Sequence, residues 1–180
     1  MRMFNFVLKY LVNRNIKRDE RKPAMLFGNS IEHVIVLSNY SSEGFQTVMQ
    51  YVRELRERGI KHVDFLIEFD SKKSMEANSS NLKGVAFCSK DIGVFGSIKN
   101  PDLQSCLNNA YEIVLDLTDG TCVHSDYVLT LLNATWRVGL KRRGRSKFLD
   151  LIIDGDSKQL KNSIEHLNSY LFNLNNLSAA

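Results

Sequence analysis

One stretch, EIVLDLTDGTCVHSDYVLTLL at residues 112–132, constrains the fold more than any other part of the chain. Its apolar run ends at Asp116, as expected of a parallel strand that is buried on both faces. A polar turn follows, and then apolar residues recur at helical spacing. The residues that can cap this helix by accepting its unpaired N–H bonds are His124, Ser125 and Asp126. The stretch therefore predicts a strand, a turn and a helix of an α/β fold.

The region from residue 31 to 69 repeats this order. HVIVLSN at 33–39 reads as a buried strand, and a helix with one apolar face follows, with Gly59 placed where a helix end needs positive φ. HVDFLIEF at 62–69 reads as a second strand. Strand, helix and strand within about 40 residues predict a βαβ unit.

The segments that follow are shorter. Residues 70–83 are polar and predict a surface loop, and residues 85–87 predict a short strand. Asn100 and Pro101 suit the start of a helix that runs to about residue 110.

Two more apolar runs, WRVGL at 136–140 and FLDLII at 148–153, are separated by only seven residues. This is too few for a helical crossover, so we expect a hairpin or an antiparallel edge there. A leucine-rich stripe from residue 160 to 174 predicts a final helix packed on the core.

The fold expected from these elements is a three-layer Rossmann-like or flavodoxin-like α/β sheet, mostly parallel with an antiparallel edge as an alternative. The chain has 180 residues, of which 43% are hydrophobic, enough for one such domain. We expect a basic amphipathic helix and connector at 1–22 and a single domain at 23–180.

Polar residues at the carboxyl ends of the strands are the candidates for ligand binding, because open α/β sheets bind ligands at this edge. These candidates are Asn39, Ser41, Ser42, Asp116, Thr118, Asp119 and His124. The chain contains neither GxxxxGK[ST] nor GxGxxG, so a P-loop and a dinucleotide fingerprint are both excluded. Turns and helix caps favour the same residue types, and that simpler interpretation is preferred.

Three catalytic or metal arrangements were weighed. The spacing of Asp116 and Asp119 differs by one residue from the DxDxT loop of haloacid-dehalogenase-like phosphatases, so that resemblance is rejected. Asp116, Asp119 and Asp154 are an alternative Mg²⁺ set. Cys122, His124 and Asp126 resemble a nucleophile, a base and an orienting group, but alternate residues at one helix start seldom converge.

The cysteines together with His124 are an alternative set of zinc ligands, but buried free thiols are the favoured interpretation. The sequence therefore predicts no catalytic residue, no metal and no cofactor, and it leaves open whether the protein is an enzyme. Three widely spaced cysteines suit a reducing compartment. We expect a cytoplasmic protein, with peripheral contact to the inner membrane face as an alternative.

Positive charge is concentrated in two segments. Residues 1–22 carry seven basic and two acidic side chains, a net charge of +5, whereas the whole chain carries +4. Residues 137–147 carry six basic side chains and no acidic one. Such segments attract an anionic membrane surface or RNA. The side chains expected to make this contact are Arg2, Lys9, Arg14, Lys17, Arg18, Lys141, Arg142, Arg143 and Arg145.

The start of the chain, MFNFVLKYLV at 3–12, predicts an amphipathic helix with a wide apolar face. The run is too short to span a membrane. Packing on the protein's own domain or on a protein partner is the expected use of the apolar face, and insertion into a membrane surface is the alternative.

Several segments together resemble a family of small uncharacterised bacterial proteins, a domain of unknown function, over nearly the whole chain. These segments are VIVLSNYSSEGFQTVMQYVRELRERGIK, SKDIGVFGSIKN, EIVLDLTDG, HSDYVLTLLNATWRVGLK and FLDLIID. The resemblance implies an α/β domain and carries over no activity.

Two functions are consistent with the sequence. The favoured one is a non-enzymatic binding or accessory domain that contacts an anionic surface through its basic segments. The alternative is a binder of, or an enzyme acting on, a phosphorylated or nucleotide ligand at the strand ends.

Overall fold

The computed structural model describes residues 2–21, 31–42, 44–79, 82–142, 147–155 and 159–176. The strands in this part of the chain are β1 (His33–Asn39), β2 (His62–Phe69), β3 (Val85–Cys88), β4 (Ala110–Asp116), β5 (Asn133–Leu140) and β6 (Leu151–Ile153). The helices are α1 (Arg2–Lys17), α2 (Gly44–Glu57), α3 (Lys72–Asn78), the short 3-10 helix η1 (Ser89–Asp91), α4 (Pro101–Asn108), α5 (Val123–Leu131) and α6 (Leu160–Asn176).

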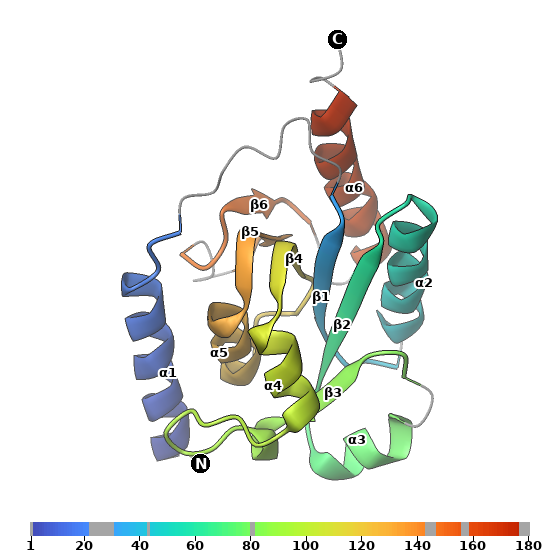
Figure 1. Cartoon of the computed structure of the whole chain (residues 1–180). Helices are drawn as coiled ribbons and strands as arrows, with labels where there is room; N and C mark the ends of the chain where they lie inside the picture. The colour runs from blue at the N-terminus through green and yellow to red at the C-terminus, as the bar shows by residue number, and fades with distance from the viewer. Residues whose placement is uncertain are drawn as a thin grey trace.

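The strands form a parallel sheet with the order β3-β2-β1-β4-β5-β6 (Figure 1). This is the order of the doubly wound Rossmann fold. The chain builds one half of the sheet outward from β1 and the other half outward from β4. The predicted α/β class is therefore confirmed.

Helices cover both faces of the sheet, which explains the long apolar runs of the central strands. On one face, α2 and α6 pack on the strand side chains that point to that face, such as Val36 and Leu115. On the other face, α1, α4 and α5 pack on the remaining side chains, such as Ile35 and Val114. The result is a three-layer arrangement with two separate apolar cores.

Helix α1 packs on the domain. Leu8, Leu11 and Val12 are buried in the same core as α5, and the Asn15 side-chain amide donates to Thr130 Oγ1 at 3.1 Å. Of the two packing partners that the sequence leaves open, the structure therefore shows the protein's own domain. The predicted division between 1–22 and 23–180 stays a prediction.

The loop after η1 closes over the contact between α1 and α5. Tyr127 of α5 donates its hydroxyl hydrogen to the Gly96 carbonyl at 2.9 Å. Gly96 has a φ of 83°, and a Cβ there would meet the Tyr127 hydroxyl and the Leu11 side chain. Only glycine fits this close approach without strain. The loop consequently holds its exposed residues Val94 and Phe95 beside α1.

Two local predictions are confirmed by backbone geometry. Gly59 ends α2 with a φ of 94°. Asn100 caps α4 by accepting from the backbone N–H groups of Asp102 and Leu103, and Pro101 is the first helical residue.

Three local predictions are wrong. The edge strand β6 pairs with β5 in parallel, so there is no antiparallel edge among the described strands. β6 has only three residues, so the chain has a short distance to cover between the end of β5 and the start of β6. The ten residues between the two strands can span this distance, because an extended chain reaches about 3.3–3.6 Å per residue. The expected loop at 70–83 contains α3, which Ser71 caps by accepting from the Ser74 N–H.

The third correction concerns the start of α5. Cys122 occupies the cap position and makes no side-chain capping bond. The predicted caps His124, Ser125 and Asp126 instead lie inside the helix. The side chains of His124 and Ser125 face Glu68, the last polar residue of β2.

Candidate functional site

A pocket opens at the carboxyl edge of the sheet, between the ends of β1 and β4. These strands are neighbours, but the helices that follow them, α2 and α5, cover opposite faces of the sheet. Connections that leave in opposite directions open a crevice, and doubly wound proteins bind ligands at this switch point. The pocket has a volume of about 420 Å³, which suits a small molecule.

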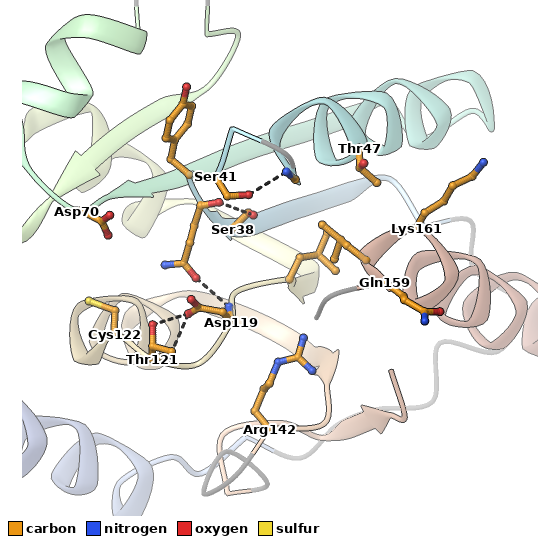
Figure 2. A pocket seen from close by; sticks show the side chains of 15 residues that line it. Ser38, Ser41, Thr47, Asp70, Asp119, Thr121, Cys122, Arg142, Gln159 and Lys161 are labelled. Carbon is orange, nitrogen blue, oxygen red and sulfur yellow. Dashed lines mark hydrogen bonds between the residues drawn. The ribbon is translucent and has the colours of Figure 1, made fainter. Parts of the chain in front are cut away.

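Six segments line the pocket (Figure 2). The end of β1 and the loop after it contribute residues 38–41, and the first turn of α2 contributes Gly44 and Thr47. The loop after β4 contributes Leu117, Asp119, Thr121 and Cys122. Arg142 and the start of α6, residues 159–161, complete the wall, and Asp70 lies beyond β2.

Asn39 fixes the floor of the site because its side chain bonds in two directions. Its Oδ1 accepts from the backbone N–H of Asp119 at 2.9 Å, which ties the loop after β4 to β1. Its Nδ2 donates to Glu68 Oε2 at 3.0 Å, which ties β1 to β2. The residue was predicted as a ligand-binding candidate, and the structure shows it joining three strand ends.

Ser41 shapes the start of α2. Its Oγ accepts from the Gly44 N–H at 2.9 Å, and its carbonyl accepts from the Phe45 N–H at 2.9 Å. The first turn of α2 thus begins at the pocket wall, where the positive end of the helix dipole favours an anion. Ser42 is exposed and does not line the pocket.

The charged side chains of the pocket are separated. Figure 2 shows Gln159 and Lys161 at one end and Asp70 and Cys122 at the other, with Arg142 reaching toward the pocket from the segment after β5. Arg142 Nη1 donates to the carbonyls of Lys141 at 2.9 Å and Gly155 at 3.2 Å. The pocket therefore has a cationic end and an end that offers carboxylate acceptors.

The aspartates after β4 have different surroundings. Asp119 is exposed at the pocket, and its Oδ1 accepts from the N–H and the hydroxyl of Thr121 at 2.9 and 2.8 Å. Asp116 is buried, and its Oδ1 accepts from the N–H and hydroxyl of Thr118 at 3.0 and 2.6 Å. Asp116 and Thr118 thus shape the turn beneath the pocket and do not line it. The alternative Mg²⁺ set, which adds Asp154, is not among the described residues that converge as metal ligands.

A second group of polar side chains lies next to the pocket, and we name it the strand-end cluster. Glu68 is its centre and is only 4% exposed. Glu68 Oε1 lies 2.7 Å from Cys122 Sγ and 3.5 Å from His124 Nδ1, and these two atoms are 3.0 Å apart. Glu68 Oε2 accepts from Asn39 and from the Ser125 hydroxyl.

The sequence suggested Cys122, His124 and Asp126 as a nucleophile, a base and an orienting group. The cluster contains the first two of these residues, with Glu68 in place of Asp126. Cys122 and His124 converge, because a cap residue and a residue of the first turn both face the end of β2. Glu68 takes the place that the sequence assigned to Asp126. Burial, and then the charge and hydrogen bond of Glu68, raise the pKa of the Cys122 thiol to about 12. The thiol is consequently protonated at neutral pH and is not a ready nucleophile.

Sequence reasoning found part of this site. Asn39, Ser41 and Asp119 line the pocket, and His124 lies in the cluster beside it. Glu68 was missed. Its signal was a carboxylate within the apolar, buried second half of β2, a position where a charge needs a partner.

The predicted surface contacts have several environments. Lys9, Arg14, Lys17 and Arg18 are exposed on or just after α1. Lys141 pairs with Asp154 at 3.3 Å, and Arg142 faces the pocket instead of an outer surface. The side chain of Arg2 and the whole of Arg143 and Arg145 lie outside the described residues.

Two arginines counted in the basic segments are used internally, in what we name the edge network. Arg137 is 4% exposed and its Nη1 lies 2.8 Å from Asp19 Oδ2. Arg21 lies 2.8 Å from Asp19 and 3.0 Å from Asp150. Asp150 also accepts from the backbone N–H of Arg137 at 2.8 Å. Two cations and two carboxylates thus join the end of α1 to β5.

Within the described ranges, no helix combines the length and the apolarity needed to cross a bilayer. The strand order and the pocket at its switch point define the chain as a doubly wound α/β protein with a Rossmann-like sheet.

More particularly, the chain belongs to a family of unknown function (DUF6913), whose profile matches residues 5–174. The predicted membership in a family of unknown function is confirmed. No curated protein and no solved structure shows significant similarity to the chain.

Proposed function

We propose that this protein binds a small phosphate-bearing ligand in the pocket between β1 and β4. The observation that carries the proposal is the position of a polar pocket at the switch point of the sheet, with the start of α2 on one wall and Arg142 and Lys161 on another. Each of these features favours an anion, and they meet in one cavity.

The phosphate end of the ligand is assigned to the side of the pocket formed by α2 and α6. The positive end of the α2 dipole lies on this side, and Ser41 holds the start of the helix there by accepting from the Gly44 N–H. Arg142 supplies a planar guanidinium that is fixed by two carbonyls, and Lys161 supplies a mobile ammonium.

The other end of the pocket favours hydroxyl or amine groups. Asp70 and Asp119 present carboxylate oxygens there, which accept hydrogen bonds and repel a second phosphate. A volume of about 420 Å³ holds a mononucleotide or a sugar phosphate more readily than a dinucleotide. The absence of GxGxxG from the loop after β1 agrees with this choice.

Calorimetric titration with AMP, ribose 5-phosphate and inorganic phosphate tests the proposal. We expect at least one of these compounds to bind the wild-type chain and Lys161→Gln to weaken that binding about tenfold, since it removes one charge-assisted bond. Lys17→Gln, an exposed lysine on α1, is the matched control and should change nothing. Equal binding by both variants, or no binding of any of the three probes, would reject the pocket as a phosphate site.

A second candidate function is attachment to an anionic membrane surface through the outer face of α1. The specific observation is that aromatic side chains are exposed there: Phe6 is 72% and Tyr10 62% exposed, and Phe95 on the adjacent loop is 85% exposed. Lys9 and Lys17 share this face at helical spacing. Aromatic residues flanked by lysines are typical of helices that lie in a membrane interface.

Co-sedimentation with vesicles tests this attachment without unfolding the protein, because these side chains are outside the core. A Phe6→Ser/Tyr10→Ser variant should lose binding to phosphatidylglycerol vesicles at high salt, whereas Lys9→Gln/Lys17→Gln should lose it at low salt. Binding to RNA that depends on the lysines alone would instead support the nucleic-acid alternative. Unchanged vesicle binding in both variants would contradict attachment through α1.

A further inference from the structure

The strand-end cluster brings three different metal-ligating atoms to one point. Glu68 Oε1, Cys122 Sγ and His124 Nδ1 all lie within 4.8 Å of one another. Carboxylate, thiolate and imidazole are the three side-chain ligand types of zinc proteins. We propose that Glu68, Cys122 and His124 bind one Zn²⁺ ion. The proposal stands independently of the phosphate ligand.

The spacing of the three atoms is close to that of a zinc site. Zinc–ligand bonds of about 2.0–2.3 Å in a tetrahedron place neighbouring ligand atoms about 3.6 Å apart. The Nδ1–Oε1 separation of 3.5 Å already matches this value. The Sγ atom lies 2.7 Å from Oε1 and 3.0 Å from Nδ1, so it must move outward by less than about 1 Å. Cys122 is a cap residue with no capping bond of its own, so its side chain has that freedom.

The charge of the cluster also favours a cation. Glu68 is almost completely buried, and among the described residues its only ion-pair partner is His124. Buried carboxylates in proteins are paired with a cation or bound to a metal. One Zn²⁺ ion would neutralise Glu68 and the Cys122 thiolate together, and binding would release the thiol proton to solvent.

The neighbours of Glu68 provide the support that metal ligands usually have. Asn39 and Ser125 donate to Oε2 and leave Oε1 directed at Cys122 and His124. Hydrogen bonds of this kind to a metal ligand orient it and raise metal affinity. The His124 ring lies 5.6 Å from the Phe4 ring of α1, so α1 also covers one side of the cluster.

Three protein ligands leave the fourth position of a tetrahedral zinc ion to water or substrate, the arrangement found in catalytic zinc sites. Cys122 belongs to the wall of the pocket as well as to the cluster (Figure 2). Cys122 therefore places the proposed ion next to the pocket. Figure 2 shows Cys122 at the end of the pocket where Asp70 lies, opposite Lys161.

Cobalt titration of the metal-stripped full-length chain tests the site directly, because cobalt bound to a thiolate gives a near-ultraviolet charge-transfer band. We expect one Co²⁺ per chain, displaced by one Zn²⁺. Cys122→Ser should abolish the band and weaken zinc binding by more than about 100-fold, beyond the 10–100-fold typical of changes to residues that hydrogen-bond a metal ligand. Cys106→Ser, a buried cysteine of α4, is the matched control and should keep both.

Protection of the thiol gives a second readout that does not depend on the fold of a variant. Zinc should slow alkylation of Cys122 by iodoacetamide in the wild-type chain, measured by mass spectrometry, and should leave Cys106 unaffected. A cobalt band that survives Cys122→Ser, or alkylation of Cys122 that zinc does not slow, would overturn the proposal. Rapid alkylation of Cys122 in zinc would point instead to a free nucleophilic thiol.

Discussion

The edge network and the strand-end cluster are both built from charged side chains with little exposure, but their charges are balanced differently. In the edge network, Arg21 and Arg137 face Asp19 and Asp150, so two cations meet two carboxylates. In the strand-end cluster, Glu68 faces a thiol, a hydroxyl, an amide and an imidazole that is charged only if protonated. The first arrangement is balanced by its own side chains, whereas in the second the only ion-pair partner of Glu68 among the described residues is His124. We therefore assign the edge network to stability and the strand-end cluster to function.

The largest expected effect comes from breaking the balanced network. Arg137→Met leaves Asp19 and Asp150 beside an apolar side chain and removes the bonds from Arg137 to the Leu132 and Thr130 carbonyls. Removing one member of a buried ion pair costs about 3–5 kcal/mol, and we expect about 3 kcal/mol because Asp19 keeps 20% of its side chain exposed. Urea unfolding measures this loss. Arg14→Met, on the exposed face of α1, should stay within about 0.5 kcal/mol of wild type, and a loss below 1 kcal/mol for Arg137→Met would contradict the assignment.

Glu68→Gln, unlike Arg137→Met, should leave the stability of the metal-free protein nearly unchanged. Without metal, the variant removes a buried carboxylate whose only ion-pair partner among the described residues is His124, and it keeps an oxygen that can accept from Asn39 and Ser125. Its unfolding free energy should therefore lie within about 1 kcal/mol of wild type. With zinc at 100 times its dissociation constant, wild type should gain about 2.7 kcal/mol and the variant almost nothing. Urea unfolding in chelator and in zinc gives both values. A large loss of stability in chelator would mean that Glu68 is structural.

A smaller effect is expected from the pH dependence of the edge network. Burial raises the pKa of Asp19, but the hydrogen bond from Arg21 and the charge of Arg137 outweigh it, so the pKa lies below its ordinary value of 3.8. A carboxyl whose pKa is lower in the folded state stabilises the fold above its unfolded pKa and loses this contribution as pH falls through the folded pKa. The stability difference between wild type and Asp19→Asn should therefore be full at pH 6 and shrink below about pH 4. Unfolding at both pH values measures it, and a difference that grows in acid would have the wrong sign.

The sequence predicted the sheet well because its signals were local. The apolar runs of β1, β2 and β4 identify buried parallel strands, and Asn100, Pro101 and Gly59 mark helix ends by their own conformational preferences. The parallel edge at β6 was missed because the rule for crossovers assumes a full-length strand, and β6 has three residues. Helix α3 was missed because it buries no residue and leaves no apolar stripe.

The site was predicted only in part, for a related reason. Asn39, Ser41 and Asp119 follow strand ends, where position along the chain already predicts position in the fold. Glu68 and Cys122 meet only through the packing of β2 against the start of α5, 54 residues apart, and no local pattern contains that contact. Arg137 looked like part of a basic surface because a run of cations follows it, yet strand alternation turns its side chain to the inside.

Anomalous scattering at the zinc absorption edge, from crystals of the full-length chain grown with zinc, tests most directly the claim that the unbalanced cluster is a cation site. The account predicts a peak about 2.0–2.3 Å from Cys122 Sγ, His124 Nδ1 and Glu68 Oε1, with Asn39 and Ser125 still donating to Oε2. A map with no peak there, and with Cys122 still hydrogen-bonded to Glu68, would contradict it.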